Sequence, residues 1–168
     1  MIANECFNCA DPNIGLSLNE DRTYVKCYMG DTGLLISHTF DENEISDSEL
    51  YREILFGKLS VNEGMFYENA VAQMLVAAGH KLYFYVRYDE SKHRNDVEID
   101  FIISNKSKLK YKICPIEVKS KERYSTVSLN KFKTKFSQRI EESYVIHPKN
   151  FKIEDKTLYL PPYMVFCL

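Results

Sequence analysis

The sequence predicts an α/β fold in which a mixed central sheet is flanked by helices. Two observations support this prediction: helical and strand-like patterns alternate along the chain, and the strands are rich in β-branched and aromatic residues. From residue 61 the predicted order is α-β-β-β-α-β. The helices fall at about 62–78 and 126–140, and the strands at 81–88, 97–103, 111–119 and 144–147, with a further short strand at 157–160.

The first helix is indicated by its ends and by its apolar spacing. Ser60 and Glu63 stand at capping-box spacing ahead of an apolar run that continues to Ala78. Gly79 suits a left-handed residue that ends the helix. Next comes the segment KLYFYVRY, in which Tyr83, Tyr85 and Tyr88 are expected to pack in the core or on a sheet face.

The following two strands form a predicted hairpin. Residues 97–103 alternate, so Val97, Ile99, Phe101 and Ile103 should share one face and Glu98, Asp100 and Ile102 the other. The polar residues 104–110 are expected to connect this strand to the next one, 111–119. The hairpin would bring Asp100 and Glu117 together.

The second helix shows apolar residues at spacings of three and four, with lysines around the rest of its surface. Its apolar stripe is Leu129, Phe132, Phe136 and Ile140. Residues 1–60 are less regular, with a short strand expected at 24–28. We therefore divide the chain into an N-terminal extension packed on the core, 1–60, and a main domain, 61–168.

Charge is segregated along the chain. Residues 1–53 hold eleven acidic residues against three Lys or Arg, whereas 101–139 hold two against eleven. A basic stretch is the electrostatic pattern expected of a protein that binds a phosphate backbone, although a solvated lysine face is the commoner explanation. The candidate nucleic-acid contacts are Lys121, Arg123, Lys131, Lys133 and Lys135.

Other function classes find little support. No apolar run is long enough to cross a membrane, and the N-terminus does not resemble a signal peptide. The five cysteines do not form a disulfide framework, and Cys6 and Cys9 lack further ligands at zinc spacing. We expect a cytoplasmic protein with reduced thiols.

The residues that suggest chemistry are charged groups within apolar strands. Asp100 interrupts one strand, while Glu117 and Lys119 alternate on another and leave it on the same face. Buried carboxylates are normally paired or bound to a metal. Asp100 and Glu117 would suit Mg²⁺, which takes one or two carboxylates together with waters and substrate phosphate oxygens, and Lys119 would stabilise charge in a transition state. The alternative is an ion-pair arrangement on a half-exposed sheet.

These residues resemble a known family. Asp100 followed by Glu117-Val118-Lys119 is similar to the signature of the PD-(D/E)XK nuclease superfamily, whose restriction-endonuclease-like core has the order αβββαβ. Many members carry a further glutamate on the first helix, and Glu68 matches it. The resemblance implies a catalytic set of Glu68, Asp100, Glu117 and Lys119, with Mg²⁺ or Mn²⁺ on the three carboxylates.

A closer resemblance is to the C-terminal domain of unknown function found in prokaryotic AAA-type ATPases. The similar stretches are KCYMGDTGLL (26–35), GMFYEN (64–69), EIDF (98–101) and PIEVKS (115–120). The chain has no G-x-x-x-x-G-K-[ST] motif, so we expect no ATP site in it. The resemblance implies an ATPase module as a partner, in the same chain or another.

Two functions follow as expectations. The first is a metal-dependent DNA nuclease domain that works with an ATPase. The second is a catalytically inactive module of nuclease fold that binds nucleic acid, regulates or docks on the ATPase, or self-associates as a homo-oligomer.

Overall fold

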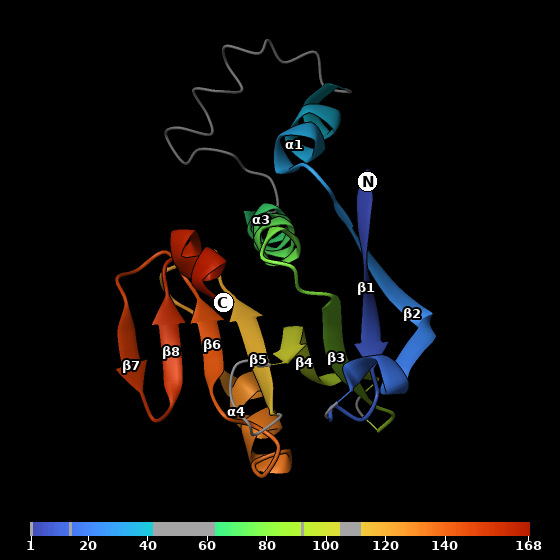
Figure 1. Ribbon diagram of the computed structural model, residues 1–168, viewed down its shortest axis with the longest axis vertical. Coiled ribbons are helices and arrows are strands. Elements are labelled where there is room, and N and C mark those ends of the chain that lie inside the picture. Colours follow the sequence, from blue (N-terminus) through green and yellow to red (C-terminus); the bar gives the residue numbers. More distant parts are fainter. Residues whose placement is uncertain (1, 14, 42–62, 92, 105–111) are drawn as a thin grey trace.

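The computed structural model describes residues 2–13, 15–41, 63–91, 93–104 and 112–168 (Figure 1). Its strands are β1 (Ala3–Cys9), β2 (Glu20–Met29), β3 (Leu82–Asp89), β4 (Arg94–Ser104), β5 (Ile113–Val118), β6 (Ser143–Ile146), β7 (Lys152–Glu154) and β8 (Thr157–Leu160). Its α-helices are α1 (Thr32–Asp41), α3 (Glu63–Ala77) and α4 (Val127–Lys135), and its 3₁₀ helices are η1 (Leu16–Asn19) and η2 (Pro162–Cys167). The α/β class and the order α3-β3-β4-β5-α4-β6 are confirmed.

All eight strands join one mixed sheet in the order β2-β1-β3-β4-β5-β6-β8-β7. Parallel pairs form between β1 and β3, β5 and β6, and β6 and β8, and the other neighbours are antiparallel. The strand predicted at 24–28 falls within β2, but no strand was predicted at β1. The two strands β1 and β2 pair with each other. They form one end of the sheet, so residues before 60 belong to its core architecture.

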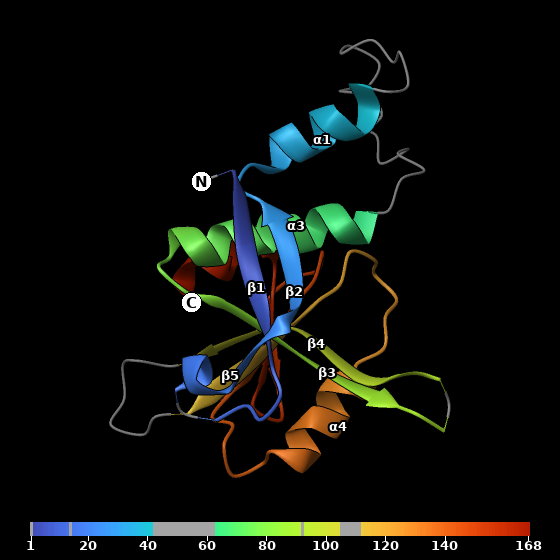
Figure 2. The same ribbon diagram turned by 90° about the vertical axis from the view of Figure 1, so that its right-hand side faces the viewer.

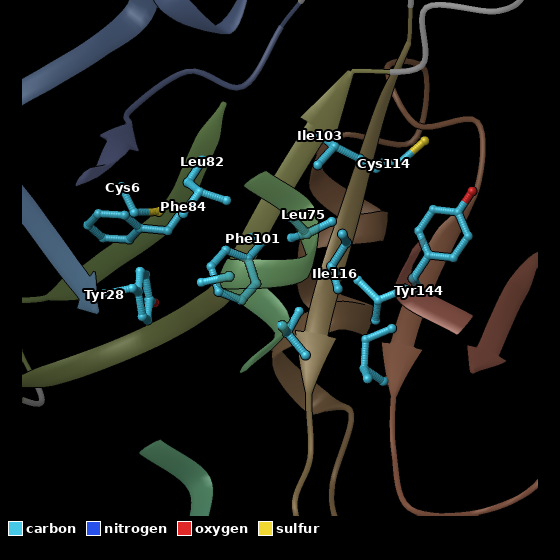
Figure 3. Packing of buried hydrophobic residues seen from close by; sticks show 14 of the residues in the cluster. Cys6, Tyr28, Leu75, Leu82, Phe84, Phe101, Ile103, Cys114, Ile116 and Tyr144 are labelled. Carbon is cyan, nitrogen blue, oxygen red and sulfur yellow. The ribbon is translucent and has the colours of Figure 1, made fainter. Parts of the chain in front are cut away.

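Helices α3 and α4 lie on opposite sides of the sheet (Figure 2), and an apolar cluster packs between the sheet and each of them. On one side, Val71, Ala72 and Leu75 of α3 pack on residues from β1 to β8, including the tilted ring pair of Tyr28 and Phe101 (Figure 3). On the other side, Leu129 and Phe132 of α4, with Phe136 directly after the helix, pack on residues of β3, β4 and β6. The strands β3, β4, β5 and β6 bury side chains on both faces, which explains the apolar runs in their sequences.

A bulge in β4 changes which side chains share a face. Tyr85 pairs with Ile99, but Tyr83 pairs with Ile102, so β4 holds one extra residue between these pairs. Val97, Ile99 and Ile102 therefore face α4, while Phe101 and Ile103 face α3. The strict alternation predicted for 97–103 is wrong beyond Ile99, because an inserted residue reverses the parity of those that follow.

The predicted helix ends are partly confirmed. Gly79 adopts a φ of 88° just after α3, as its position predicted. Ser60 and most of the connection predicted at 104–110 lie outside the described residues. The helix predicted to reach residue 140 ends at Lys135, and Ile140 instead bridges to Ile113 in an extended conformation while still packing against the α4 cluster.

Other expectations also meet mixed outcomes. Tyr83 and Tyr85 are buried as predicted, but Tyr88 is 55% exposed near the outer end of β3. No disulfide joins the five cysteines, all of which lie in the described part of the chain. Within the described part of the chain, no helix is long and apolar enough to span a lipid bilayer.

Candidate functional site

A cleft of about 730 Å³ lies between the start of α3, the end of β2 and the end of β5. Its polar lining comes from elements far apart in the sequence. Its charged side chains and tyrosines are Lys26, Tyr28, Glu68, Asp100, Lys119, Lys121, Arg123 and Tyr124. Three of the four residues predicted as catalytic, Glu68, Asp100 and Lys119, are among them.

Asp100 enters the cleft at the β4 bulge. Hydrogen-bonded pairing of β4 with β5 extends only to Phe101 and Ile116, and beyond that point the Val118 amide donates to Asp100 Oδ2 over 2.7 Å. Burial, with the neighbouring Glu68 carboxylate, raises the Asp100 pKa to about 7, although the Val118 amide, Lys26 and Lys119 favour the ionised form. Asp100 is thus a carboxyl group that titrates near neutral pH.

Glu68 reaches the same cleft from the second turn of α3. Its Oε1 accepts hydrogen bonds from the Tyr28 hydroxyl and, over 3.3 Å, from Lys26 Nζ. Burial and the Glu68 carboxylate raise the Tyr28 pKa, so Tyr28 remains a phenol and a donor. The α3 helix therefore presents a carboxylate that is already held by two partners.

Lys26 of β2 forms ion pairs with Glu68 of α3 and Glu98 of β4. Its ammonium lies 3.0 Å from Glu98 Oε1. Burial alone would lower the Lys26 pKa, but Glu68, Glu98 and Asp100 raise it above its usual value, so the side chain is charged. Lys26 and Tyr28 were not selected as site residues from the sequence; the available indication was their alternate spacing on one strand within a family-like stretch.

Glu117 occupies a different position from Asp100. Ile116 and Val118 face α3, so Glu117 leaves β5 on the α4 side, beside Val145 of β6. It is 3% exposed, and burial raises its pKa even though Lys119 Nζ lies 3.2 Å from its Oε1. The other oxygen, Oε2, has no hydrogen-bond partner among the described residues. Glu117 does not line the cleft, although Lys119 does.

The carboxylates do not form a ready three-ligand group. Within the described ranges, no three or more His, Cys, Asp or Glu side chains are grouped so that they could hold a metal ion. Glu68 and Asp100 share the cleft, whereas Glu117 is paired with Lys119 behind it. Metal binding by these residues remains a prediction.

The residues predicted to contact nucleic acid fall into two groups. Lys121 and Arg123 line the cleft on the loop after β5. Lys131, Lys133 and Lys135 project from α4 and already contact the protein: Lys131 pairs with Asp96, Lys133 donates to Thr157 Oγ1 over 2.7 Å, and Lys135 to the Tyr85 hydroxyl over 2.9 Å. Only the first group adjoins Asp100 and Glu68.

Comparison with known proteins gives one match. The model of a family described as a domain of unknown function (DUF4143) matches residues 63–163, which is more than half of the chain. The matched range contains Glu68, Asp100, Glu117 and Lys119 but not Lys26 or Tyr28. No curated protein and no solved structure matches the chain.

Proposed function

The chain belongs to the DUF4143 family, a domain typically found at the C-terminus of AAA-type ATPases, and from its cleft we propose that it is a metal-dependent nuclease domain acting on DNA. One observation carries the proposal. Asp100, with a pKa raised to about 7, and Glu68 share a cleft with the cations Lys119, Lys121 and Arg123. This combination suits an anionic substrate together with a divalent cation.

The donor set in the cleft fits a hard cation. Mg²⁺ and Mn²⁺ take oxygen ligands, and Mg²⁺ commonly uses one or two protein carboxylates and completes its shell with water and phosphate oxygens. Asp100 and Glu68 would be the protein ligands. A cation would also favour the ionised form of Asp100, whose burial otherwise opposes ionisation. Glu117, the third ligand expected from the PD-(D/E)XK resemblance, would have to act from behind Lys119.

A bound divalent cation would polarise the scissile phosphate and lower the pKa of a water molecule. The protein's own contribution is positional and electrostatic. Lys119 places an ammonium at the end of β5, where it would offset negative charge that develops on the phosphate. Lys121 and Arg123 would hold the flanking phosphate backbone.

A second function is favoured by the ion pairs in the cleft. Lys26 neutralises Glu68, and Lys119 pairs with Glu117, so part of the expected catalytic set is satisfied without a metal. A module with these pairs would keep the fold to bind nucleic acid or to dock on an ATPase, or would self-associate. The partners proposed are thus DNA, an ATPase module and a second copy of the chain. Cysteines that form no disulfide within the described residues fit a reducing, cytoplasmic setting for all of these.

Calorimetric titration of Mn²⁺ and Mg²⁺, with and without a short DNA duplex, tests the proposal. We expect Asp100→Asn and Glu68→Gln each to weaken metal binding at least about tenfold, the effect of losing ~1.4 kcal/mol. Asp96→Asn is the matched control, because Asp96 is a carboxylate on the same strand that pairs with Lys131 and Arg87 outside the cleft. Cleavage of the duplex should need the metal and both cleft carboxylates.

The outcomes separate the two functions. Absence of metal binding by the wild-type protein with DNA present would overturn the nuclease mechanism. Salt-sensitive duplex binding without cleavage would support the nucleic-acid module. Sedimentation over a range of concentrations would detect self-association, with or without DNA.

A further inference from the structure

Tyr124 and His147 form a hydrogen-bonded pair at the edge of the cleft. Tyr124 belongs to the loop that leaves β5, and Figure 2 shows this loop passing along the side where α3 begins and down to α4. Its hydroxyl oxygen lies 2.7 Å from His147 Nδ1. Tyr124 lines the cleft with Lys121 and Arg123, whereas His147 lies directly after β6 and is fully buried.

The surroundings of His147 fix its ring. Its backbone N–H donates to the Leu160 carbonyl over 3.0 Å, which extends the pairing of β6 with β8. The ring sits between two aromatic side chains, with centroids 5.8 Å from Tyr124 and 5.6 Å from Tyr159. Its Nε2 has no hydrogen-bond partner in the described part of the chain. The Nδ1 atom of this buried ring is directed at Tyr124.

The protonation of the pair follows from burial. Burial lowers the His147 pKa, aided by Lys152 and Lys149 and opposed by the Asn150 backbone, so the ring is neutral near pH 7. A neutral ring carries its proton on one nitrogen. Among the described residues Nε2 has no hydrogen-bond partner that could accept its proton, whereas a proton on Nδ1 can be donated to the Tyr124 oxygen. The tautomer with its proton on Nδ1 therefore has the lower free energy.

With Nδ1 as the donor, Tyr124 accepts from the histidine and keeps its own proton for another acceptor. Burial also raises the Tyr124 pKa, so that proton stays on the oxygen at neutral pH. Because Tyr124 lines the cleft, its hydroxyl can donate to a ligand bound there. A ligand oxygen near Lys121 and Arg123 would meet an oriented, uncharged donor in the same cleft as these two cations.

We propose that the Tyr124 hydroxyl donates a hydrogen bond to a phosphate oxygen of nucleic acid in the cleft, and that His147 is the positioning residue that orients it. The inference rests on the proposed function, because it names the substrate contact within the same cleft. Lys121 and Arg123 would attract the phosphate backbone by their charge, and the Tyr124 hydroxyl would add a directional hydrogen bond. Neither Tyr124 nor His147 was given a role by the sequence pattern.

Duplex binding by fluorescence anisotropy, together with steady-state cleavage, tests the substrate contact. Tyr124→Phe should weaken binding of a labelled DNA duplex about tenfold, since one hydrogen bond to a charged group is lost. The loss should appear in KM more than in kcat, and thermal stability should change little. Tyr163→Phe is the matched control, because Tyr163 is 74% exposed on η2 and lies outside the cleft lining.

His147 variants test positioning. His147→Asn keeps an N–H donor near the position of Nδ1 and should retain most of the affinity, whereas His147→Leu should resemble Tyr124→Phe. The ¹⁵N spectrum of His147 in the unliganded protein should show a neutral ring protonated on Nδ1. A ring protonated on Nε2, or equal affinities of the Asn and Leu variants, would overturn the positioning role.

The failure of this inference is distinguishable from failure of the proposed function. If the wild type binds and cleaves the duplex and Tyr124→Phe does so equally well, the Tyr124 contact is wrong and the proposed function stands. If the wild type neither binds nor cleaves, the proposed function fails and the phosphate contact fails with it.

Discussion

At the scale of single residues, two aspartates of β4 lie in opposite environments: ionisation of Asp100 is disfavoured by burial in the cleft, and that of Asp96 is favoured by cations outside it. Asp100 has a pKa raised to about 7, mainly by burial, whereas that of Asp96 on the same strand is lowered to about 2, mainly by its hydrogen bond to Lys131. The two aspartates therefore contribute to stability with opposite signs. Their contrast gives a direct test of the Asp100 environment.

Asp100→Asn should raise stability at alkaline pH. The folded-state pKa of Asp100 exceeds its unfolded value, so the folded protein binds more protons between about pH 4 and 7 and loses stability as pH rises through this window. Asparagine keeps an oxygen for the Val118 amide and removes the charge. Urea unfolding at pH 5 and pH 8 should show a gain of about 1–2 kcal/mol at pH 8 that shrinks at pH 5.

Asp96→Asn supplies the contrast for that experiment. Its lowered pKa means that its contribution is fully present above pH 4 and is lost only in acid. The variant should therefore be less stable than the wild type by a similar amount at pH 5 and pH 8. A stability difference for Asp100→Asn that is equally flat with pH would contradict the raised pKa.

Glu117→Gln tests whether Glu117 is a metal ligand or a buried partner of Lys119. Replacing one member of a buried pair is costly when it strands the other, but the Lys119 side chain is 24% exposed and lines the cleft. We expect unfolding free energy at pH 8 to change by less than about 1 kcal/mol. Manganese affinity should stay within about threefold, a shift below ~1 kcal/mol. A tenfold loss of affinity in calorimetry would instead place Glu117 among the ligands.

The residue pattern predicted part of this site. Glu68, Asp100 and Lys119 line one cleft. The sequence singled them out because packing alone poorly explains a glutamate beside an apolar helix stripe or charges within apolar strands. The placement of Asp100 and Glu117 on opposite faces of the sheet could not be predicted in the same way. It depends on the extra residue in β4, which turns Asp100 and Phe101 toward α3 while β5 keeps its regular alternation.

At the scale of elements, the bulge lets two residues at alternate positions of β4 pack on opposite faces of the sheet. Ile99 packs on the α4 side, and Phe101, two residues later, packs on the α3 side against Tyr28. Bulges occur often beside functional sites because they redirect side chains. Here the bulge aims Asp100 at the cleft, and the packing of Phe101 holds it in place.

Phe101→Ala should destabilise the fold and the cleft together. Phe101 is fully buried beneath Tyr28, so truncation should cost about 3–5 kcal/mol in urea unfolding. Tyr88→Ala is the control, because Tyr88 is 55% exposed on the neighbouring strand and should cost less than about 1 kcal/mol. Equal losses for the two variants would mean that Phe101 does not anchor the bulge.

Element boundaries were the least predictable feature of the sequence. The spacing of Leu129, Phe132 and Phe136 correctly indicated the buried stripe of α4, but Ile140 joined the same cluster from an extended bridge. Apolar periodicity reports which residues are buried and does not distinguish a last helical turn from a strand that packs at the same place. The strand β7, which is exposed along its length, had no apolar pattern to reveal it.

At the scale of the whole molecule, the N-terminal strands are integral to the sheet and to the cleft. The family match begins at residue 63, yet β1 pairs in parallel with β3, and β2 supplies Lys26 and Tyr28. Asn69 of α3 strengthens this connection: its side chain accepts from the Met29 amide over 2.8 Å and donates to Thr32 Oγ1 over 2.9 Å. The sequence predicted an extension packed on the core, because β1 shows too little alternation to be recognised alone.

A fragment of residues 61–168 should therefore fail to form the native core, although it contains the whole matched range. It would lose Cys6 and Tyr28 from the cluster that contains Phe84 and Phe101. It would also make β3 an edge strand, because β3 would pair with β4 but no longer with β1. We expect weak near-ultraviolet circular dichroism, no cooperative thermal transition and concentration-dependent aggregation, whereas residues 1–168 unfold cooperatively.

Asn69→Ala in the full chain gives a milder form of the same test. It leaves the Met29 backbone groups without their partners and should cost about 1–3 kcal/mol, whereas Asn130→Ala, at an exposed position of α4, should cost far less. If the fragment folds cooperatively and Asn69→Ala has no effect, β1 and β2 are an appendage and the cleft is completed by residues that the core does not require. If both fail as expected, the unit that folds and the unit that carries the cleft are the same, and each needs the strands that precede the matched range.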